Sequence, residues 1–348
     1  MTPAATVPRR LSRALLLVVL LAALAGAFVA AVDMREAGRL LERTDWARVP
    51  PALLLTAVSY VSVSAALVAL CGPMGVAAPR GPMMRIAVIS VAVNNLVSFG
   101  GVAGYSLRAA LSRPHGVATG HSLAMSLTHA YLNNLFMFLL LAVGLFLLVG
   151  DSAMDPAWRR TLEAGGILAV AFALLSTAAL FSGTVRGAIL ALGQRLASRL
   201  PGRWRTSLAT ALDELDEALG RAAGAFRLAP RAMLWPLAFL GLHWCAMLGA
   251  FWCCLSAFAG PADVGVLVGG FSVGAVAGFA SLLPGGVGVQ DGSLAAILVV
   301  QGVSVEAAVL AALLFRLVYY LVPFVVTLPL YAAALRRRSS ETPAGNEG

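Results

Sequence analysis

The sequence contains no lysine, so all 25 of its basic residues are arginines, and only 12% of its residues are charged. Typical soluble domains are about 25% charged. Together with a hydrophobic share of 60% and a mean hydropathy of +0.87, this scarcity of charge excludes a soluble globular protein. The composition instead predicts an all-α polytopic integral membrane protein.

Cysteine is also scarce, and the four cysteines show neither CxxC spacing nor the framework of a disulfide-rich domain. The chain lacks the HExxH, P-loop and GxSxG motifs, and it has no acidic pair spaced for a metal-dependent transfer reaction. We therefore expect no catalytic residue, no metal and no cofactor, and we interpret the protein as a non-enzyme. Its net charge of +9 lies mostly in loops and tails, which indicates membrane topology rather than a nucleic-acid partner.

Long apolar runs account for most of the chain. Six of them approach or exceed the ~20 residues that a membrane-crossing helix needs. We predict full crossings at 14–32, 50–70, 121–149, 163–182, 232–259 and 305–335.

Two further apolar blocks are interrupted by glycines. Gly100 and Gly101 break the block that begins at Met83, and the PGGVG sequence at 284–288 breaks the block between Val264 and Gln301. Neither arm of the first block reaches the length of a crossing, and in the second block the PGGVG turn interrupts the chain within the membrane. We therefore predict two re-entrant broken hairpins.

Arginine placement predicts the orientation. The segment from Gly183 to Arg231 carries eight arginines, and Arg336, Arg337 and Arg338 follow the last span. By the positive-inside rule we expect both termini to lie in the cytoplasm. This divides the chain into a cytoplasmic tail (1–13), an N-terminal transmembrane half (14–182), a cytoplasmic linker (183–230), a C-terminal transmembrane half (231–335) and a cytoplasmic tail (336–348).

The cytoplasmic linker contains an amphipathic helix. Leu208, Leu212, Leu215 and Leu219 recur at helical spacing, with acidic residues around the other side. We expect this helix, at 203–229, to lie on the membrane surface or to pack on a partner protein.

The two glycine breaks resemble each other, because Gly100-Gly101-Val102-Ala103 aligns with Gly285-Gly286-Val287-Gly288. The predicted topology places the first hairpin on the cytoplasmic side and the second on the outer side. The chain is therefore predicted to contain an inverted repeat, at roughly 50–149 and 231–335, of the kind that recurs in secondary transporters.

Arg316 is the costliest residue of the last span. It lies near the midplane, where an arginine costs about 2.5–3.5 kcal/mol on insertion scales. Asp291 is its natural partner, and Tyr320 lies four residues further on, on the same helix face. A structural ion pair with Asp291 and a binding site for a lipid phosphate both fit this pattern.

The first half contains its own polar residues within apolar segments. Arg108 follows the first glycine break, and His129 and Asn133 lie four residues apart on one long helix. Buried polar residues that bridge helices explain this pattern, and substrate binding is the alternative. Asn94, Asn95 and Asn134 receive the same structural interpretation, and His243, beside Trp244, is interpreted as a packed or interfacial residue.

Most of the chain resembles the flippase-like transmembrane domain of the lysylphosphatidylglycerol synthase family, and the specific part of the resemblance is the motif from Pro284 to Pro323. The family's pattern of proline, glycines, an acid, then arginine, tyrosine and proline falls here on Pro284, Gly285, Gly286, Gly288, Asp291, Arg316, Tyr320 and Pro323. Two departures are visible: this chain has Gln290-Asp291 where the family often has a basic residue and glutamate, and no aminoacyl-transfer domain follows. The resemblance implies the lipid-translocating part of the family, without its aminoacylating enzyme.

Together with the resemblance, these observations predict a flippase-like translocase in the inner (plasma) membrane of a bacterium. Its expected substrate is an amphiphilic lipid or lipid-linked molecule with an anionic head group, such as a phospholipid or a polyprenyl-linked sugar. The alternatives are a secondary transporter of a small anion, and a non-transporting membrane subunit that docks an envelope-assembly enzyme through the 203–229 helix. Membrane lipid is the expected partner. The candidate substrate-binding residues are Arg316, Tyr320, Asp291, Gly285, Gly286, Gly288, Arg108, His129 and Asn133.

Overall fold

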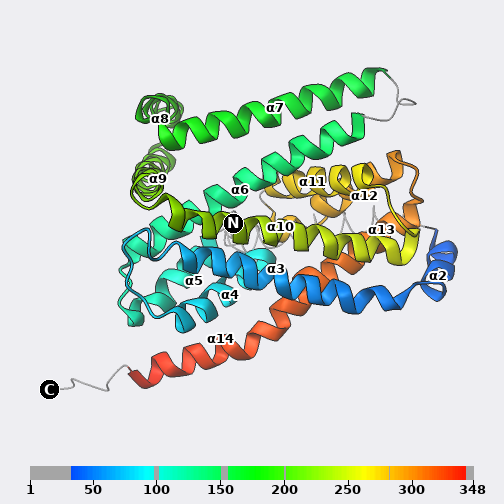
Figure 1. Ribbon diagram of the computed structural model, residues 1–348, viewed down its shortest axis with the longest axis horizontal. Helices are drawn as coiled ribbons and strands as arrows, with labels where there is room; N and C mark the ends of the chain where they lie inside the picture. Colours follow the sequence, from blue (N-terminus) through cyan, green and yellow to red (C-terminus); the bar gives the residue numbers. More distant parts are fainter. Residues whose placement is uncertain (1–32, 98–101, 150–155, 200, 282, 342–348) are drawn as a thin grey trace, which may run out of the picture.

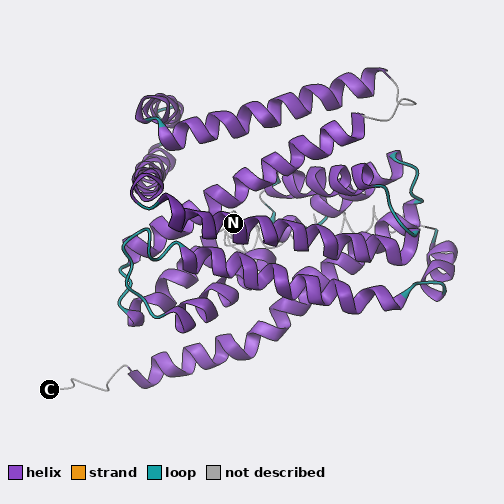
Figure 2. Ribbon diagram, viewed as in Figure 1, coloured by secondary structure: helices purple, strands orange, loops and turns teal. Residues whose placement is uncertain are grey.

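The computed structural model describes residues 33–97, 102–149, 156–199, 201–281 and 283–341, and this part of the chain contains helices and loops but no strand (Figure 2). The first predicted span, 14–32, lies outside these residues, as does the Gly100–Gly101 break. The helices are α2 (Met34–Glu42), η1 (Trp46–Arg48), α3 (Val49–Ala69), α4 (Arg80–Val97), α5 (Val102–Ser112), η2 (Arg113–His115), α6 (Thr119–Val149), α7 (Pro156–Phe181), α8 (Gly183–Ala197), α9 (Gly202–Leu228), α10 (Pro230–Ala259), α11 (Val264–Ala280), η3 (Pro284–Gly286), α12 (Val289–Val300), α13 (Val305–Arg316), the π-helix η4 (Leu317–Leu321) and α14 (Val322–Glu341).

Five stretches of the described chain are long and apolar enough to cross a membrane, and they match the five predicted spans that fall within it. They are Trp46–Ala69, Thr119–Val149, Pro156–Phe181, Pro230–Ala259 and Val305–Ala333. The third begins earlier than expected, at Pro156 inside a predicted polar loop, because proline is tolerated in the first turn of a helix. The chain is thus a multi-pass membrane protein.

The two broken blocks form two antiparallel helix pairs. In the first hairpin, α4 and α5 approach so closely that a Cβ on Gly104 would lie 2.8 Å from Asn94 Cβ. In the second, α11 and α12 meet along glycines: a Cβ on Gly274 would lie 2.8 Å from Leu294 Cβ, and one on Gly278 would lie 2.8 Å from Gln290 Cβ. Glycine at these positions permits the close backbone approach.

The turn of the second hairpin meets the C-terminal part of α4, in the first hairpin, inside the bundle. A Cβ on Gly285, in the turn of the second hairpin, would lie 2.7 Å from the carbonyl oxygen of Asn95, near the end of α4. Figure 1 shows the first hairpin reaching in from the end of the bundle where α3 finishes, and the second reaching in from the opposite end. The long helices α3 and α10 pack against each other beside this junction.

Four buried aromatic rings fix the helices around the second hairpin. Phe251 of α10, Phe271 of α11, Phe315 of α13 and Tyr319 of η4 form a continuous cluster, in which Phe315 and Tyr319 stack with centroids 5.1 Å apart. All four side chains are buried. Because such rings pack with specific geometry, the cluster sets the rotation of α13 and η4 relative to the hairpin.

The linker between the two halves is two helices rather than one. Its second helix, α9, matches the predicted amphipathic helix, but the C-terminal half of its apolar face packs on the protein itself: Leu219 and Ala222 are buried beside Tyr131 of α6 and Leu180 of α7. Arg186 of α8 binds Asp216 of α9, with Nε 2.6 Å from Oδ1. Figure 1 shows α8 and α9 end-on, so they run across the long helices.

Labelling with a membrane-impermeant maleimide tests the predicted sidedness in a variant without the native cysteines. Pro261→Cys, in the loop between α10 and α11, is expected to label in intact cells. Ser198→Cys, at the end of α8, is expected to label only after permeabilisation, since the adjoining segment carries eight arginines. Labelling of Ser198→Cys in intact cells would contradict the predicted orientation.

Candidate functional site

The predicted pair of Arg316 and Asp291 exists and locks the turn of the second hairpin. Arg316 donates through Nε to Asp291 Oδ1 at 2.9 Å, and its NH2 lies 2.9 Å from Oδ2, a bidentate pair. NH1 and NH2 also donate to the carbonyl oxygen of Gly285, each at 3.1 Å. The other side of the carboxylate accepts the Gly288 backbone N–H at 3.0 Å.

This arrangement leaves Arg316 with its donors directed at protein acceptors, while its guanidinium carbon lies 4.9 Å from the Tyr320 ring centroid. Gly285, Gly286 and Gly288 have φ of 58°, 62° and 80°, values that disfavour any residue with a side chain. The ion pair and the glycines therefore act together to shape the tip of the hairpin.

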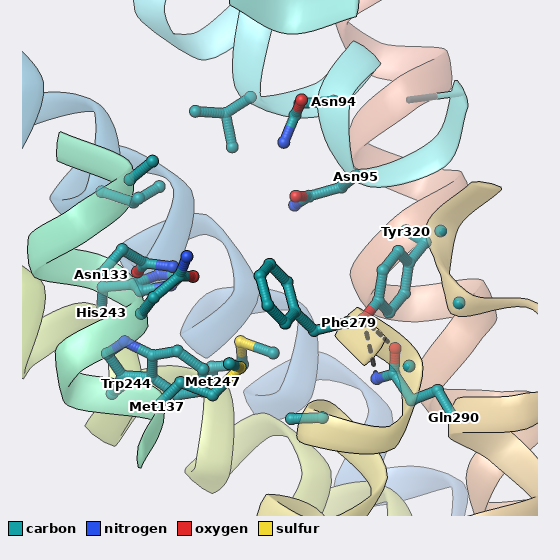
Figure 3. Close-up of a pocket in the computed structure, with 18 of the residues that line it drawn as sticks. Asn94, Asn95, Asn133, Met137, His243, Trp244, Met247, Phe279, Gln290 and Tyr320 are labelled. Atoms are coloured by element: carbon teal, nitrogen blue, oxygen red, sulfur yellow. Dashed lines mark hydrogen bonds between the residues drawn. The ribbon is translucent and has the colours of Figure 1, made fainter. Parts of the chain in front are cut away.

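A cavity of about 250 Å³ lies where the turn of the second hairpin meets α4 and α5 of the first (Figure 3). It gathers residues from both hairpins, from α3, α6 and α10, and from η4. Six of the predicted site residues line it: Arg108, His129, Asn133, Gly285, Gly286 and Tyr320. Arg316, Asp291 and Gly288 are not among its lining residues. They hold the turn of the second hairpin, whose Gly285 and Gly286 do line the cavity.

Arg108 is the cation of this cavity, and its side chain is buried at 3% exposure. Its Nε and NH2 donate to Ser90 Oγ at 3.2 and 3.1 Å, and NH1 donates to Ser126 Oγ at 2.8 Å. Both serine hydroxyls give their own protons to backbone carbonyls, Ser90 to Ala87 and Ser126 to Ser122, which turns their lone pairs toward the arginine.

No carboxylate among the described residues lies within ion-pair distance of Arg108, in contrast to Arg316. Its position follows from the hairpin: it lies one helical turn after Gly104, on the face of α5 that approaches α4. A buried guanidinium with neutral partners alone is a costly arrangement, because charge in a low-dielectric interior is normally paired.

Two histidines line the cavity and are tied to the backbone of α3. His129 Nε2 lies 3.0 Å from the carbonyl oxygen of Val63. His243 Nδ1 lies 2.8 Å from Ser59 Oγ, which in turn lies 2.7 Å from the hydroxyl of Tyr319. These bonds hold the imidazoles in place across α3, α6, α10 and η4.

A second hydrogen-bond path connects the cavity wall to the hairpins. Asn95 Nδ2 donates to the Tyr60 hydroxyl at 3.1 Å, and that hydroxyl donates to the Tyr319 carbonyl at 2.9 Å. On the other wall, Gln290 and the Tyr320 hydroxyl exchange bonds of 2.9 and 3.1 Å. Tyr319 and Tyr320 belong to η4, and π-turns of this kind often occur at functional sites.

Some polar atoms of the cavity residues have no partner. The side-chain oxygens of Asn94 and Asn133 and the indole N–H of Trp244 are buried without a hydrogen bond among the described residues. Buried polar atoms are normally satisfied, so these three carry an unmet hydrogen-bonding capacity beside the cavity. The sequence patterns assign Asn94 to helix bridging, leave Asn133 as either a bridging or a substrate-binding residue, and give Trp244 no role.

Among the described residues, no three His, Cys, Asp or Glu side chains are placed to hold a metal ion. What the site offers is a guanidinium, carboxamides, imidazoles and an indole N–H around a small cavity. Such groups bind and orient a polar ligand.

Comparison with known proteins agrees with the site's motif. The family model described as the lysylphosphatidylglycerol synthase TM region matches residues 13–327. No curated protein matches the chain. The match covers both hairpins, the cavity and the Arg316 pair, and the chain therefore belongs to the lysylphosphatidylglycerol synthase transmembrane family.

Proposed function

We propose that the protein is a flippase-like translocase for a membrane lipid with an anionic head group, and that it transports rather than catalyses. The observation that carries this proposal is Arg108, a buried cation on the wall of a polar cavity that has no carboxylate partner in the described part of the chain. An arginine at membrane depth costs about 2.5–3.5 kcal/mol on insertion scales. A phosphate that enters the cavity would supply the missing counter-charge and accept the guanidinium's hydrogen bonds.

The arrangement of the hairpins supports alternating access. The first and second hairpins enter from opposite ends of the bundle and meet at the cavity, as expected for an inverted repeat of broken helices (Figure 1). In this proposal the cavity opens to one side of the membrane and then to the other, as one hairpin moves relative to its neighbours.

An apolar groove favours a lipid over a small anion as the substrate. It has a volume of about 340 Å³ and lies between the first hairpin and α14, lined by Ile89, Val93, Leu107, Phe324, Thr327, Leu328 and Tyr331. Val93 and Leu107 adjoin the cavity residues Asn94 and Arg108 in sequence, so the same hairpin separates a polar space from an apolar one. A head group in the cavity and an acyl chain in the groove would use both faces.

Reconstitution in liposomes tests the lipid assignment. We expect transfer of an acyl-labelled anionic phospholipid between leaflets, and no protein-dependent uptake of radiolabelled inorganic phosphate. Phosphate uptake without lipid transfer would contradict the proposal and favour a small-anion transporter.

The groove offers a matched pair of variants, because Leu328 and Leu330 of α14 are each 43% exposed and Leu328 alone of the two lines the groove. Leu328→Trp is expected to slow lipid transfer about fivefold. The larger side chain would fill part of the groove and remove acyl-chain contacts that contribute about 1 kcal/mol, and that loss corresponds to about a fivefold change in rate. Leu330→Trp is expected to leave the rate within about twofold. Equal rates in the two variants would remove the groove from the transport path.

A further inference from the structure

The two histidines of the cavity are held in the same way by α3. His129 Nε2 lies 3.0 Å from the carbonyl oxygen of Val63, and His243 Nδ1 lies 3.3 Å from that of Ser59, one turn earlier. A carbonyl oxygen only accepts hydrogen bonds, so each of these ring nitrogens carries a proton. In a neutral imidazole the other nitrogen then carries a lone pair alone. The cavity wall therefore holds two imidazoles that are each able to take up one proton.

His129 is the histidine beside the cavity's cation. Ser126, which accepts a hydrogen bond of 2.8 Å from Arg108, precedes His129 by three residues and so shares its face of α6. Asn133 follows His129 by four residues on the same face, and its side-chain oxygen is buried without a partner among the described residues. His129 Nδ1 makes no hydrogen bond with the described part of the chain. Along α6, this lone pair thus stands between a fixed positive charge and an unsatisfied acceptor.

The charge of the cavity decides when His129 binds a proton. In the empty cavity an imidazolium would add a second positive charge beside Arg108, with no carboxylate on the described wall to balance it. An anion held by Arg108 reverses this effect, because a nearby negative charge favours the protonated ring. The new N–H would also be a donor for the anion or for the oxygen of Asn133. We propose that His129 binds one proton at Nδ1 when an anionic lipid enters the cavity, so that the lipid and the proton are transported together.

The groups around His129 leave it as the residue that responds to the anion. Tyrosines ionise at about pH 10, so among the described lining residues only Arg108 and the two histidines carry or acquire a charge near neutral pH. His243 lies on α10, whereas the side-chain contacts of Arg108 are with Ser90 of α4 and Ser126 of α6. Asp291 is already paired with Arg316. The titratable groups on the cavity side of α6 are Tyr60 of α3, Tyr105 and Arg108 of α5, His243 of α10, and Tyr319 and Tyr320 of η4.

The other helices that pack on α6 bring no charge to this place. α7 and α9 meet α6 through apolar side chains around Tyr131, whose hydroxyl donates to the carbonyl oxygen of Ser176. The described residues of α4, α11 and α12 that line the cavity include no titratable side chain.

This inference rests on the proposed function and names the ion coupled to it. The proton comes from water on the side where the lipid enters, forms an N–H bond at His129 Nδ1, and returns to water on the other side when the lipid leaves. One singly charged anion and one proton together add no net charge to the cavity. Transport is therefore expected to respond to a pH gradient and not to a membrane potential.

Calorimetry of the solubilised protein tests the proton uptake directly. The probe is dihexyl phosphate, an amphiphile whose phosphodiester stays singly ionised between about pH 5 and 8, the range in which histidine titrates. We expect binding to take up as much as about one proton per anion, seen as an enthalpy that varies with the ionisation enthalpy of the buffer. By reciprocity the affinity should be at least about tenfold tighter at the acid end of this range than at the alkaline end. Binding without proton uptake, at an affinity independent of pH, would overturn the inference.

His129→Gln removes the titrating group and keeps an amide donor for the Val63 carbonyl. It is expected to bind dihexyl phosphate without proton uptake, at every pH with the affinity that the wild type has at the alkaline end. His121→Gln makes the same change at the exposed start of α6 and should behave as the wild type does. Proton uptake retained in His129→Gln would contradict the assignment to His129. The wild-type titration tests the coupling even if this variant does not fold.

Liposomes with an imposed gradient separate this inference from the proposed function. We expect an acyl-labelled anionic phospholipid to accumulate in the leaflet that faces the more alkaline side, beyond the level in protein-free liposomes and by up to about tenfold per pH unit. A potassium diffusion potential should produce no accumulation. Transfer that ignores the pH gradient would overturn the inference and leave the translocase intact. Proton-linked binding of dihexyl phosphate without any lipid transfer would do the reverse, supporting the proton site and contradicting the translocase.

Discussion

Arg108→Gln is expected to reduce transfer of an anionic lipid between ten- and a hundredfold in liposomes. A hydrogen bond to a charged group contributes about 1.5–3 kcal/mol, and each 1.4 kcal/mol corresponds to a factor of ten. The glutamine can still bond to Ser90 or Ser126, which contact Arg108 now, but it carries no charge for the phosphate. Arg108→Lys should be intermediate, because it keeps the charge and loses the planar fork.

The same substitution should leave the protein folded and, without lipid, at least as thermally stable as the wild type. The reason is that Arg108 is buried without a carboxylate partner among the described residues, so its removal leaves no unpaired charge behind. Residues that serve a substrate often cost stability. Thermal unfolding in detergent, measured beside the transport assay, checks this combination.

Arg85→Gln is the matched control, because Arg85 lies exposed on α4 of the same hairpin. It should change neither transport nor stability appreciably, as surface substitutions usually have small effects. A large loss of thermal stability in Arg108→Gln would instead identify Arg108 as a structural residue, and the anion-binding role would fail.

Arg316→Ala is expected to have the opposite profile, with a loss of about 3–5 kcal/mol in stability, the usual effect of breaking a buried pair by removing one partner. The side chains of Arg316 and Asp291 are only 16% and 13% exposed, so solvent compensates little. The loss of Arg316 also leaves the Gly285 carbonyl without its two guanidinium donors and frees the turn.

A double-mutant cycle decides between the structural pair and the phosphate site. Arg316→Leu and Asp291→Leu should each destabilise, and the double variant should lose far less than the sum, because it leaves no unpaired charge. Thermal unfolding in detergent measures the stability of the wild type, the two single variants and the double variant. If Arg316→Ala were as stable as the wild type and inactive in lipid transfer, Arg316 would be a substrate residue and the structural assignment would be wrong.

Features that depend on local composition were predictable from the sequence. Apolar run length gives the five described spans, because the thickness of the bilayer sets the length of a crossing helix. The glycine break at Gly285 gives the second hairpin, since its backbone excludes a side chain. The ion pair of Arg316 and Asp291 was one of two predicted possibilities, because a charge at membrane depth needs a partner.

The linker shows the limit of a periodic pattern. The apolar stripe of α9 predicts that one helix face is covered, and the buried Leu219 agrees. The pattern does not identify the covering surface, because burial against lipid, a partner protein or the same chain would stabilise an apolar face equally well. In the structure, α6 and α7 of the same chain cover it.

Only the tertiary structure decided which arginine serves the cavity. The sequence made Arg316 the stronger candidate, since it lies deepest in a continuous apolar run, yet it is Arg108 that lines the cavity without an ion-pair partner among the described residues. The cavity is also lined by five carboxamides from α4, α6 and α12, namely Asn94, Asn95, Asn133, Asn134 and Gln290. In the sequence, each of them alone resembles a residue that bridges helices. Hydropathy and spacing describe one helix at a time, whereas the rotation of each helix about its axis, and so the face it turns to the cavity, is set by contacts between segments far apart in the chain.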